Sequence, residues 1–178
     1  MPDIGQLGEQ LVAQWLQAQS WEILHHRWRC RWGELDLIAR QYPVEGYLIP
    51  SQTPLVFVEV KTRSQGNWDA DGLLAITPQK QRKLYQAAEL FLADYPDLAS
   101  LPCRFDVAIV RCQRLPQTLE RRNTHLNSSS ANGEIPPNQE RGGWEDKGKL
   151  LLSVVLGKPV IWQGYTLVLQ DYIQSAFD

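Results

Sequence analysis

The sequence contains few cysteines, and they are not spaced as a metal site or a disulfide framework. The three cysteines among 178 residues are Cys30, Cys103 and Cys112, and no two of them have the CxxC spacing of a zinc site. An odd and sparse set of this kind is typical of reduced thiols in a cytoplasmic protein. We therefore expect that neither zinc nor disulfide bonds hold this fold together.

Long apolar runs and a strong net charge are also missing. No apolar stretch approaches the ~20 residues of a membrane-spanning helix, and the first residues, MPDIGQLGEQ, lack the basic-then-apolar order of a signal peptide. The formal net charge of −2 gives no general positive field, so any binding of nucleic acid must depend on local basic patches. We expect a cytoplasmic protein without a membrane partner.

The composition is that of one globular domain spanning residues 1–178. Hydrophobic residues make up 43% of the chain and charged residues 21%, as in ordinary folded proteins. Residues 113–149 differ, because they are rich in Asn, Ser, Gly and Pro and have almost no apolar periodicity. We interpret this segment as a flexible insertion and not as a second domain.

The spacing of apolar residues predicts an α/β fold. One predicted helix covers residues 3–19 with Asp3 as its cap, and a second follows Thr77 and ends before Pro96. Strand-like runs occupy residues 21–29, 32–40, 55–62, 103–111 and parts of 150–169, and QDYIQSAF (170–177) is expected to form a short closing helix. This order predicts a central mixed β-sheet flanked by α-helices.

The run VFVEVKTR, residues 56–63, carries two charges in what otherwise reads as a buried strand. Side chains alternate along a strand, so the valines point to one face and Phe57, Glu59 and Lys61 to the other. Charged side chains are seldom buried without a partner or a metal ion. The face with Glu59 and Lys61 is therefore either a solvated, salt-bridged surface or a functional site.

Asp36, in GELDLI, lies on the preceding predicted strand. If the two strands pair across the connection 41–54, directly opposed side chains on one face come within about 5 Å. Two carboxylates that close raise each other's pKa unless a cation lies between them. Mg²⁺ is a natural occupant, since it takes one or two carboxylates and completes its shell with water and phosphate. Lys61 beside such a site could stabilise charge on a phosphate.

Four segments in order resemble a known family. GQLGEQLVAQWL (5–16), GELDLIAR (33–40), VFVEVKTR (56–63) and CRFDVAIV (103–110) are similar to the YraN-like family of predicted endonucleases. That family belongs to the restriction-endonuclease-like superfamily with the PD-(D/E)xK active site. The resemblance implies a restriction-endonuclease-like core and hydrolysis of phosphodiester bonds in DNA, dependent on Mg²⁺ or Mn²⁺. The segments 41–54 and 113–149 are longer here than the family pattern.

The resemblance also implies roles for individual residues. Asp36 matches the metal-binding aspartate, Glu59 the second acid and Lys61 the lysine of the motif. Glu9, in LGEQ, matches a helical glutamate that several resolvase-type nucleases add to the metal shell. The other interpretation of Glu9 is a solvent-facing helix residue.

Basic residues near these motifs are candidates for contacts with nucleic acid. Arg29 and Arg31 alternate with Arg27 in RWRCRW, Arg63 follows the VFVEVK strand, and Lys80 lies near the start of the second helix. Together they could follow a phosphodiester backbone, although ordinary surface charge is the alternative. Asp106, in CRFD, is expected to be a structural partner of Arg104 or of nearby backbone.

Two other functions remain open from the sequence. One is a non-catalytic module that keeps the nuclease fold and binds nucleic acid without turnover, because family resemblance does not demonstrate activity. The other is an RNA nuclease or a resolvase that acts as a homodimer on branched DNA or repair intermediates. Binding of Mg²⁺ or Mn²⁺ separates an enzyme from the module.

Overall fold

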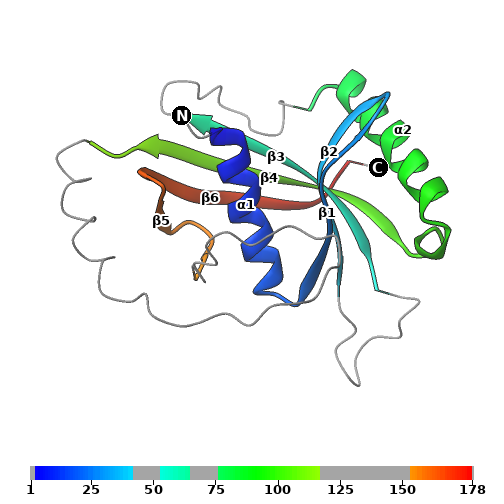
Figure 1. Ribbon diagram of the computed structural model, residues 1–178, viewed down its shortest axis with the longest axis horizontal. Helices are drawn as coiled ribbons and strands as arrows, with labels where there is room; N and C mark the ends of the chain where they lie inside the picture. The colour runs from blue at the N-terminus through cyan, green and yellow to red at the C-terminus, as the bar shows by residue number, and fades with distance from the viewer. Residues whose placement is uncertain (1–2, 42–52, 65–75, 117–152, 178) are drawn as a thin grey trace, which may run out of the picture.

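A computed structural model describes residues 3–41, 53–64, 76–116 and 153–177, which form a mixed β-sheet between two helices (Figure 1). The predicted α/β class is confirmed. The strands follow the order β1-β2-β3-β4-β6-β5, in which β3 and β4 are parallel and the other neighbours are antiparallel. The elements are α1 (Ile4–Gln17), β1 (Trp21–Cys30), β2 (Gly33–Gln41), β3 (Leu55–Ser64), α2 (Pro78–Asp94), the 3-10 turn η3 (Pro96–Leu98), β4 (Cys103–Arg114), β5 (Pro159–Trp162) and β6 (Tyr165–Phe177).

The sheet buries a separate hydrophobic cluster on each face. The valines of β3, Val56, Val58 and Val60, join the cluster under α1, whereas Phe57 joins the cluster under α2. This is the alternation expected from VFVEVKTR. Glu59, two residues after Phe57, consequently faces the α2 side of the sheet, where Lys80 of α2 reaches it.

Both helices begin at the predicted caps. The Asp3 side chain accepts a hydrogen bond from the backbone N–H of Gly5 at 2.9 Å, and the Thr77 hydroxyl accepts one from the N–H of Lys80 at 3.2 Å. Each cap satisfies a backbone donor that has no partner inside its helix. The start of α2, and with it the position of Lys80, is therefore fixed by Thr77.

Residues 170–177 form a strand, and the prediction of a short closing helix was wrong. They belong to β6, which pairs with β4 from Arg114↔Tyr165 to Phe105↔Phe177. The register shifts between Phe105 and Val107, and Ser175 has a positive φ of 45°. This irregularity interrupts the two-residue alternation of a strand, so the apolar residues fall at spacings that also suit a helix.

A buried cluster around Asp106 fixes the end of β6. The Asp106 carboxylate is fully buried and accepts hydrogen bonds from Arg104, from the Tyr172 hydroxyl at 2.7 Å and from the N–H of Ser175 at 3.0 Å. The predicted pairing of Asp106 with Arg104 is confirmed. Asp106 thus holds β6 against β4.

Two predicted segments fall largely outside the described residues. Of the connection 41–54, residues 42–52 lie outside them, but β2 and β3 pair as antiparallel neighbours, as predicted. Of the predicted insertion 113–149, the first two residues belong to β4 and residues 117–149 lie outside the description. Within the described ranges, neither helix has the length and apolar character needed to cross a membrane.

Candidate active site

The candidate site lies where β2 and β3 separate. These strands pair only from Arg40↔Leu55 to Leu37↔Val58, after which β2 continues beside β1 and β3 continues beside β4. Asp36 is the first residue of β2 past the paired segment. Its Oδ2 accepts a hydrogen bond from the backbone N–H of Val60 at 2.7 Å. The Asp36 side chain thereby accepts the hydrogen bond that the backbone of a neighbouring strand would otherwise accept from Val60. We call the place where β2 and β3 separate, with Asp36 and Glu59, the fork.

Glu59 is the buried acid at the fork, with 4% of its surface exposed. Its Oε1 contacts two ammonium groups, Lys61 Nζ at 2.6 Å and Lys80 Nζ at 3.1 Å. Its Oε2 is buried and has no hydrogen-bond partner within the described part of the chain. One oxygen of Glu59 is therefore neutralised, and the other is left without the partner that a buried carboxylate oxygen requires.

The environment of the fork disfavours the charge of Asp36. Burial first, and the charge of Glu59 second, raise the pKa of Asp36 well above its usual range. The charge of Glu9 acts in the same direction, while the N–H of Val60 and the ammonium of Lys80 oppose it. Asp36 at this position therefore favours either a bound proton or a further positive charge nearby.

The carboxylates of the fork are the type of ligand that a hard divalent cation prefers. Asp36 and Glu59 supply two carboxylates, which is the number with which Mg²⁺ commonly binds, and Glu59 Oε2 has a free lone pair there. Among the residues that the structure describes, no group of three His, Cys, Asp or Glu side chains is arranged around one metal position. A cation at the fork would therefore rest on this pair and on water or phosphate oxygens.

Glu9 lies near the fork but is held by Arg27. Its Oε2 and Oε1 accept hydrogen bonds from Arg27 Nε at 2.7 Å and Nη2 at 2.9 Å. Glu9 is 5% exposed, and burial raises its pKa despite the guanidinium. Its expected position on a solvent-facing helix surface is thus excluded. Its contribution to a metal shell stays a prediction, because Arg27 occupies both oxygens.

Arg27 was predicted only as one of three alternating arginines, and its contact with Glu9 was not predicted. It also donates to Asp3 at 3.0 Å, so it links two residues of the α1 segment to β1. Its φ of 53° lies in the left-handed region, which is uncommon for a residue other than glycine and is frequent at functional sites. A regular strand would not direct Arg27 in this way, and the only sequence signal was a basic residue close to the GELD motif.

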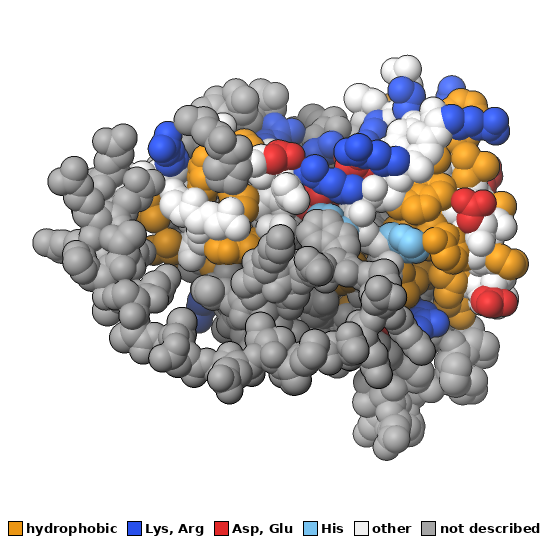
Figure 2. Space-filling model, in the orientation of Figure 1, with side chains coloured by type: hydrophobic (Ala, Val, Ile, Leu, Met, Phe, Trp, Pro, Cys, Tyr) orange, Lys and Arg blue, Asp and Glu red, His pale blue; other side chains and the backbone are white. Residues whose placement is uncertain are grey.

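The four predicted nucleic-acid contacts differ in their partners and in their exposure. Arg29 is exposed and pairs with Glu34, whereas Arg31 lies past the end of β1 with its guanidinium 5.2 Å from the centre of the Trp32 ring. Arg63 is half-buried near the end of β3. Lys80 lies at the fork itself, on Glu59. Figure 2 shows that lysine and arginine side chains gather between α1 and α2, with carboxylates among them.

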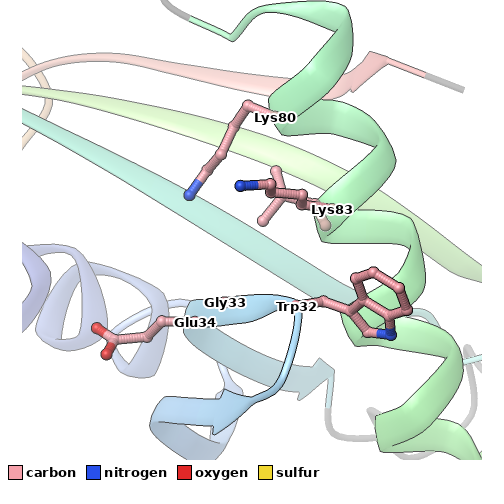
Figure 3. A pocket seen from close by; sticks show the side chains of 6 residues that line it. Trp32, Gly33, Glu34, Lys80 and Lys83 are labelled. Atoms are coloured by element: carbon pink, nitrogen blue, oxygen red, sulfur yellow. The ribbon is translucent and has the colours of Figure 1, made fainter.

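A hollow of about 190 Å³ adjoins the fork on the α2 side. It opens between the turn that joins β1 to β2 and the first half of α2 (Figure 3). In Figure 3 the side chains of Lys80 and Lys83 extend from α2 toward that turn. Lys80 lines the hollow and also contacts Glu59, so the hollow and the fork share this side chain. The lining residues are Trp32, Gly33, Glu34, Lys80, Lys83 and Leu84.

Comparison with known proteins gives a consistent family match. The sequence model described as "Uncharacterised protein family UPF0102" matches residues 8–110, which include all the fork residues and Glu9. The chain is 46% identical to a UPF0102 protein of Acaryochloris marina, over 98% of this chain and 89% of that protein. It is also 46% identical to a UPF0102 protein of Trichodesmium erythraeum, over 98% and 88%. A UPF0102 protein of Synechocystis is 41% identical over 99% of both chains.

Proposed function

This chain belongs to the uncharacterised protein family UPF0102, and from the chemistry of its fork we propose that it is a Mg²⁺-dependent endonuclease that hydrolyses phosphodiester bonds in DNA. The observation that carries the proposal is the pair Asp36 and Glu59, brought together at the end of the β2–β3 pairing with two lysines on Glu59. The YraN-like resemblance of the same segments supports it. Mn²⁺ has the same ligand preference and is the expected substitute.

Each fork residue has a distinct part in this proposal. Asp36 and Glu59 would hold the metal ion, which when bound activates a water molecule and polarises the phosphate. Lys61 and Lys80 lie 2.6 and 3.1 Å from Glu59 Oε1. With a cation held by Glu59, their ammonium groups would be available to the phosphate oxygens, on which negative charge increases during hydrolysis. Lys61 comes from the strand and Lys80 from α2, so the two approach from different elements.

Glu9 and Arg27 have no direct contact with the substrate in this proposal and act through Asp36. The bidentate contact fixes Glu9 beside Asp36, where its charge adds to the negative potential that attracts a cation. In this proposal Glu9 assists metal binding, and Arg27 is a positioning residue that acts through Glu9. Arg29, Arg31 and Arg63 would contact the phosphodiester backbone around the fork, which makes binding strongly dependent on salt.

The test is cleavage of a substrate panel with Mg²⁺, Mn²⁺ or EDTA. The panel holds single-stranded, duplex and four-way-junction DNA and one RNA, each labelled at one end. We expect metal-dependent cleavage of at least one DNA substrate by the wild type, and at least a hundredfold loss in Glu59→Gln and Asp36→Asn. RNA cleaved in preference to DNA would contradict the assignment of the substrate.

A matched control is available on the same sheet. Glu22 pairs with Arg40 at 2.7 Å near the opposite end of β1 and β2, so Glu22→Gln makes the same chemical change away from the fork. We expect it to cleave like the wild type. If Glu59→Gln cleaves as fast as Glu22→Gln on the substrate that the wild type cuts, the assignment of Glu59 is wrong.

One observation favours the non-catalytic module as a second candidate. Glu59 Oε1 already contacts two ammonium groups, and a carboxylate neutralised in this way has less need of a metal ion. Calorimetric titration with Mg²⁺ and Mn²⁺ separates the two functions. The enzyme requires binding that Glu59→Gln removes, whereas a module that only binds nucleic acid shows no heat of metal binding and no change of DNA affinity in EDTA.

A further inference from the structure

We propose that the hollow between the β1–β2 turn and α2 binds one unpaired nucleotide next to the scissile phosphate, with its base stacked on Trp32. The inference rests on the proposed function and adds the substrate class. It predicts a preference for DNA that has an unpaired nucleotide beside the cleavage site, such as a flap, a single-stranded overhang or a branch. The lining residues, their charges and the position of the hollow beside Glu59 carry the argument.

Trp32 places a partly exposed aromatic ring in the turn between β1 and β2. It lies between the last residue of β1, Cys30, and the first residue of β2, Gly33, and 36% of its surface is exposed. The Arg31 guanidinium lies 5.2 Å from the centre of its ring. The exposed part of the ring is available to a ligand. Aromatic rings are the surfaces on which proteins stack single-stranded bases, with cation–π contributions from arginine.

The charges around the hollow suit a phosphate group. Lys80 and Lys83 line it from α2 (Figure 3), whereas the Glu34 carboxylate points away, toward α1. Glu34 is engaged there by Arg29 and by Arg27, whose Nε lies 3.7 Å from Glu34 Oε1. The single acid of the lining is thus neutralised by groups outside the hollow. Lys80 already contacts Glu59, so Lys83 supplies the remaining positive charge of the lining toward a nucleotide's phosphate.

The position of the hollow fixes which nucleotide it would receive. Lys80 lines the hollow and contacts Glu59 at 3.1 Å, so a nucleotide bound there would share this lysine with the phosphate at the fork. A base in a duplex has both faces covered by its neighbours and cannot stack on a protein ring. An unpaired base can do so at little cost. Leu84 adds only apolar surface, so we expect the hollow to bind different bases without a strong preference.

The experiment measures binding without cleavage, in EDTA. Fluorescence anisotropy compares a labelled duplex that carries a short single-stranded flap with the fully paired duplex of the same length. The variants are Trp32→Ala, Trp32→Phe, and Ile161→Ala as a control at an exposed apolar residue of β5, the strand at the far edge of the sheet. Since stacking on an aromatic ring is worth about 1–3 kcal/mol per base, we expect Trp32→Ala to raise the flap Kd about fivefold or more. Trp32→Phe should keep most of the affinity.

Three outcomes would overturn the inference. They are equal wild-type affinity for flap and duplex, an unchanged flap Kd in Trp32→Ala, and an equal loss on both DNAs, which would indicate a general backbone contact or misfolding. Thermal unfolding of each variant identifies misfolding. Because the readout needs no hydrolysis, its result is separate from the cleavage panel. A flap preference that depends on Trp32 stands even if Glu59→Gln shows that the fork is not catalytic.

Discussion

At the scale of single residues, the ion pair of Glu9 and Arg27 is the contact near the fork whose loss has the clearest consequence. Glu9 is 5% exposed and Arg27 binds both of its oxygens. Arg27→Ala would leave a buried carboxylate unpaired, and we expect it to lower the free energy of unfolding by about 3 kcal/mol. Glu9→Gln should cost less, because Arg27 is partly exposed and keeps its bond to Asp3.

A double-mutant cycle in urea measures this coupling. Arg27→Ala combined with Glu9→Gln carries no unpaired charge, so it should be more stable than Arg27→Ala alone. Activity provides the second readout. If Arg27 acts through Glu9, the double variant should lose no more cleavage than Glu9→Gln does. Additive losses of stability would show that the two residues are independent and would contradict the positioning role.

The sequence allowed some of these residues to be placed and not others. Asp36 and Glu59 could be predicted to approach each other, because strand alternation and the pairing of consecutive strands are local rules. The contact of Arg27 with Glu9 could not, since it joins β1 to α1 and depends on a left-handed φ that strand alternation does not predict. The second ammonium on Glu59, from Lys80, depends on where α2 crosses the sheet, which no spacing within α2 reveals.

At the scale of secondary structure elements, the approach of α1 to β3 limits one position of the helix to glycine. A Cβ added at Gly8 would lie 1.9 Å from Thr62 Oγ1 and 3.1 Å from Thr62 Cβ. We therefore expect Gly8→Ala to destabilise the protein by about 2 kcal/mol or more, by overpacking this contact. It should also weaken cleavage, because Glu9 follows Gly8 and moves with the helix.

Thr62→Ala provides the rescue for this prediction. The Thr62 hydroxyl is buried and makes no hydrogen bond to the described residues, so its removal alone should cost little. Combined with Gly8→Ala it removes the shortest contact. Thermal unfolding should then show partial recovery of the Tm lost in Gly8→Ala. A Gly8→Ala protein as stable as the wild type would mean that α1 can shift without cost.

The elements themselves were predictable where local signals agreed with the fold. Asp3 and Thr77 begin their helices as predicted because a cap is a contact within a few residues. Residues 170–177 were predicted incorrectly because β6 is held by distant partners, the β4 backbone and the Asp106 carboxylate. Its irregular register hides the strand alternation, and contacts this far apart in sequence leave no local pattern.

At the scale of the whole molecule, the sheet divides at the fork. Of the strands described, β1 and β2 form a hairpin on one side, and β3, β4, β6 and β5 form a block on the other. α1 packs mainly on β3 and α2 mainly on β2, so the two helices lie on opposite faces of the sheet. The net charge of −2 conceals the basic groups that gather between the helices (Figure 2). A local patch, and not the overall charge, is what would bring DNA to the fork.

The fork lies between the two groups of strands. A cation bound there would contact both groups and should stabilise the whole fold. At a Mg²⁺ concentration 100-fold above its Kd, binding adds about 2.7 kcal/mol to the free energy of unfolding. For a chain of this size that corresponds to a rise in Tm of about 5–10 °C. Differential scanning fluorimetry should show this rise for the wild type and for Glu22→Gln.

Glu59→Gln should remove the rise, because it replaces the acid whose Oε2 has no other partner within the described residues. The loss of the rise in this variant alone distinguishes a specific site from general screening by salt, which would shift all variants alike. Equal Mg²⁺ shifts in the wild type and Glu59→Gln would place the cation elsewhere and leave the fork as a salt-bridged structural contact.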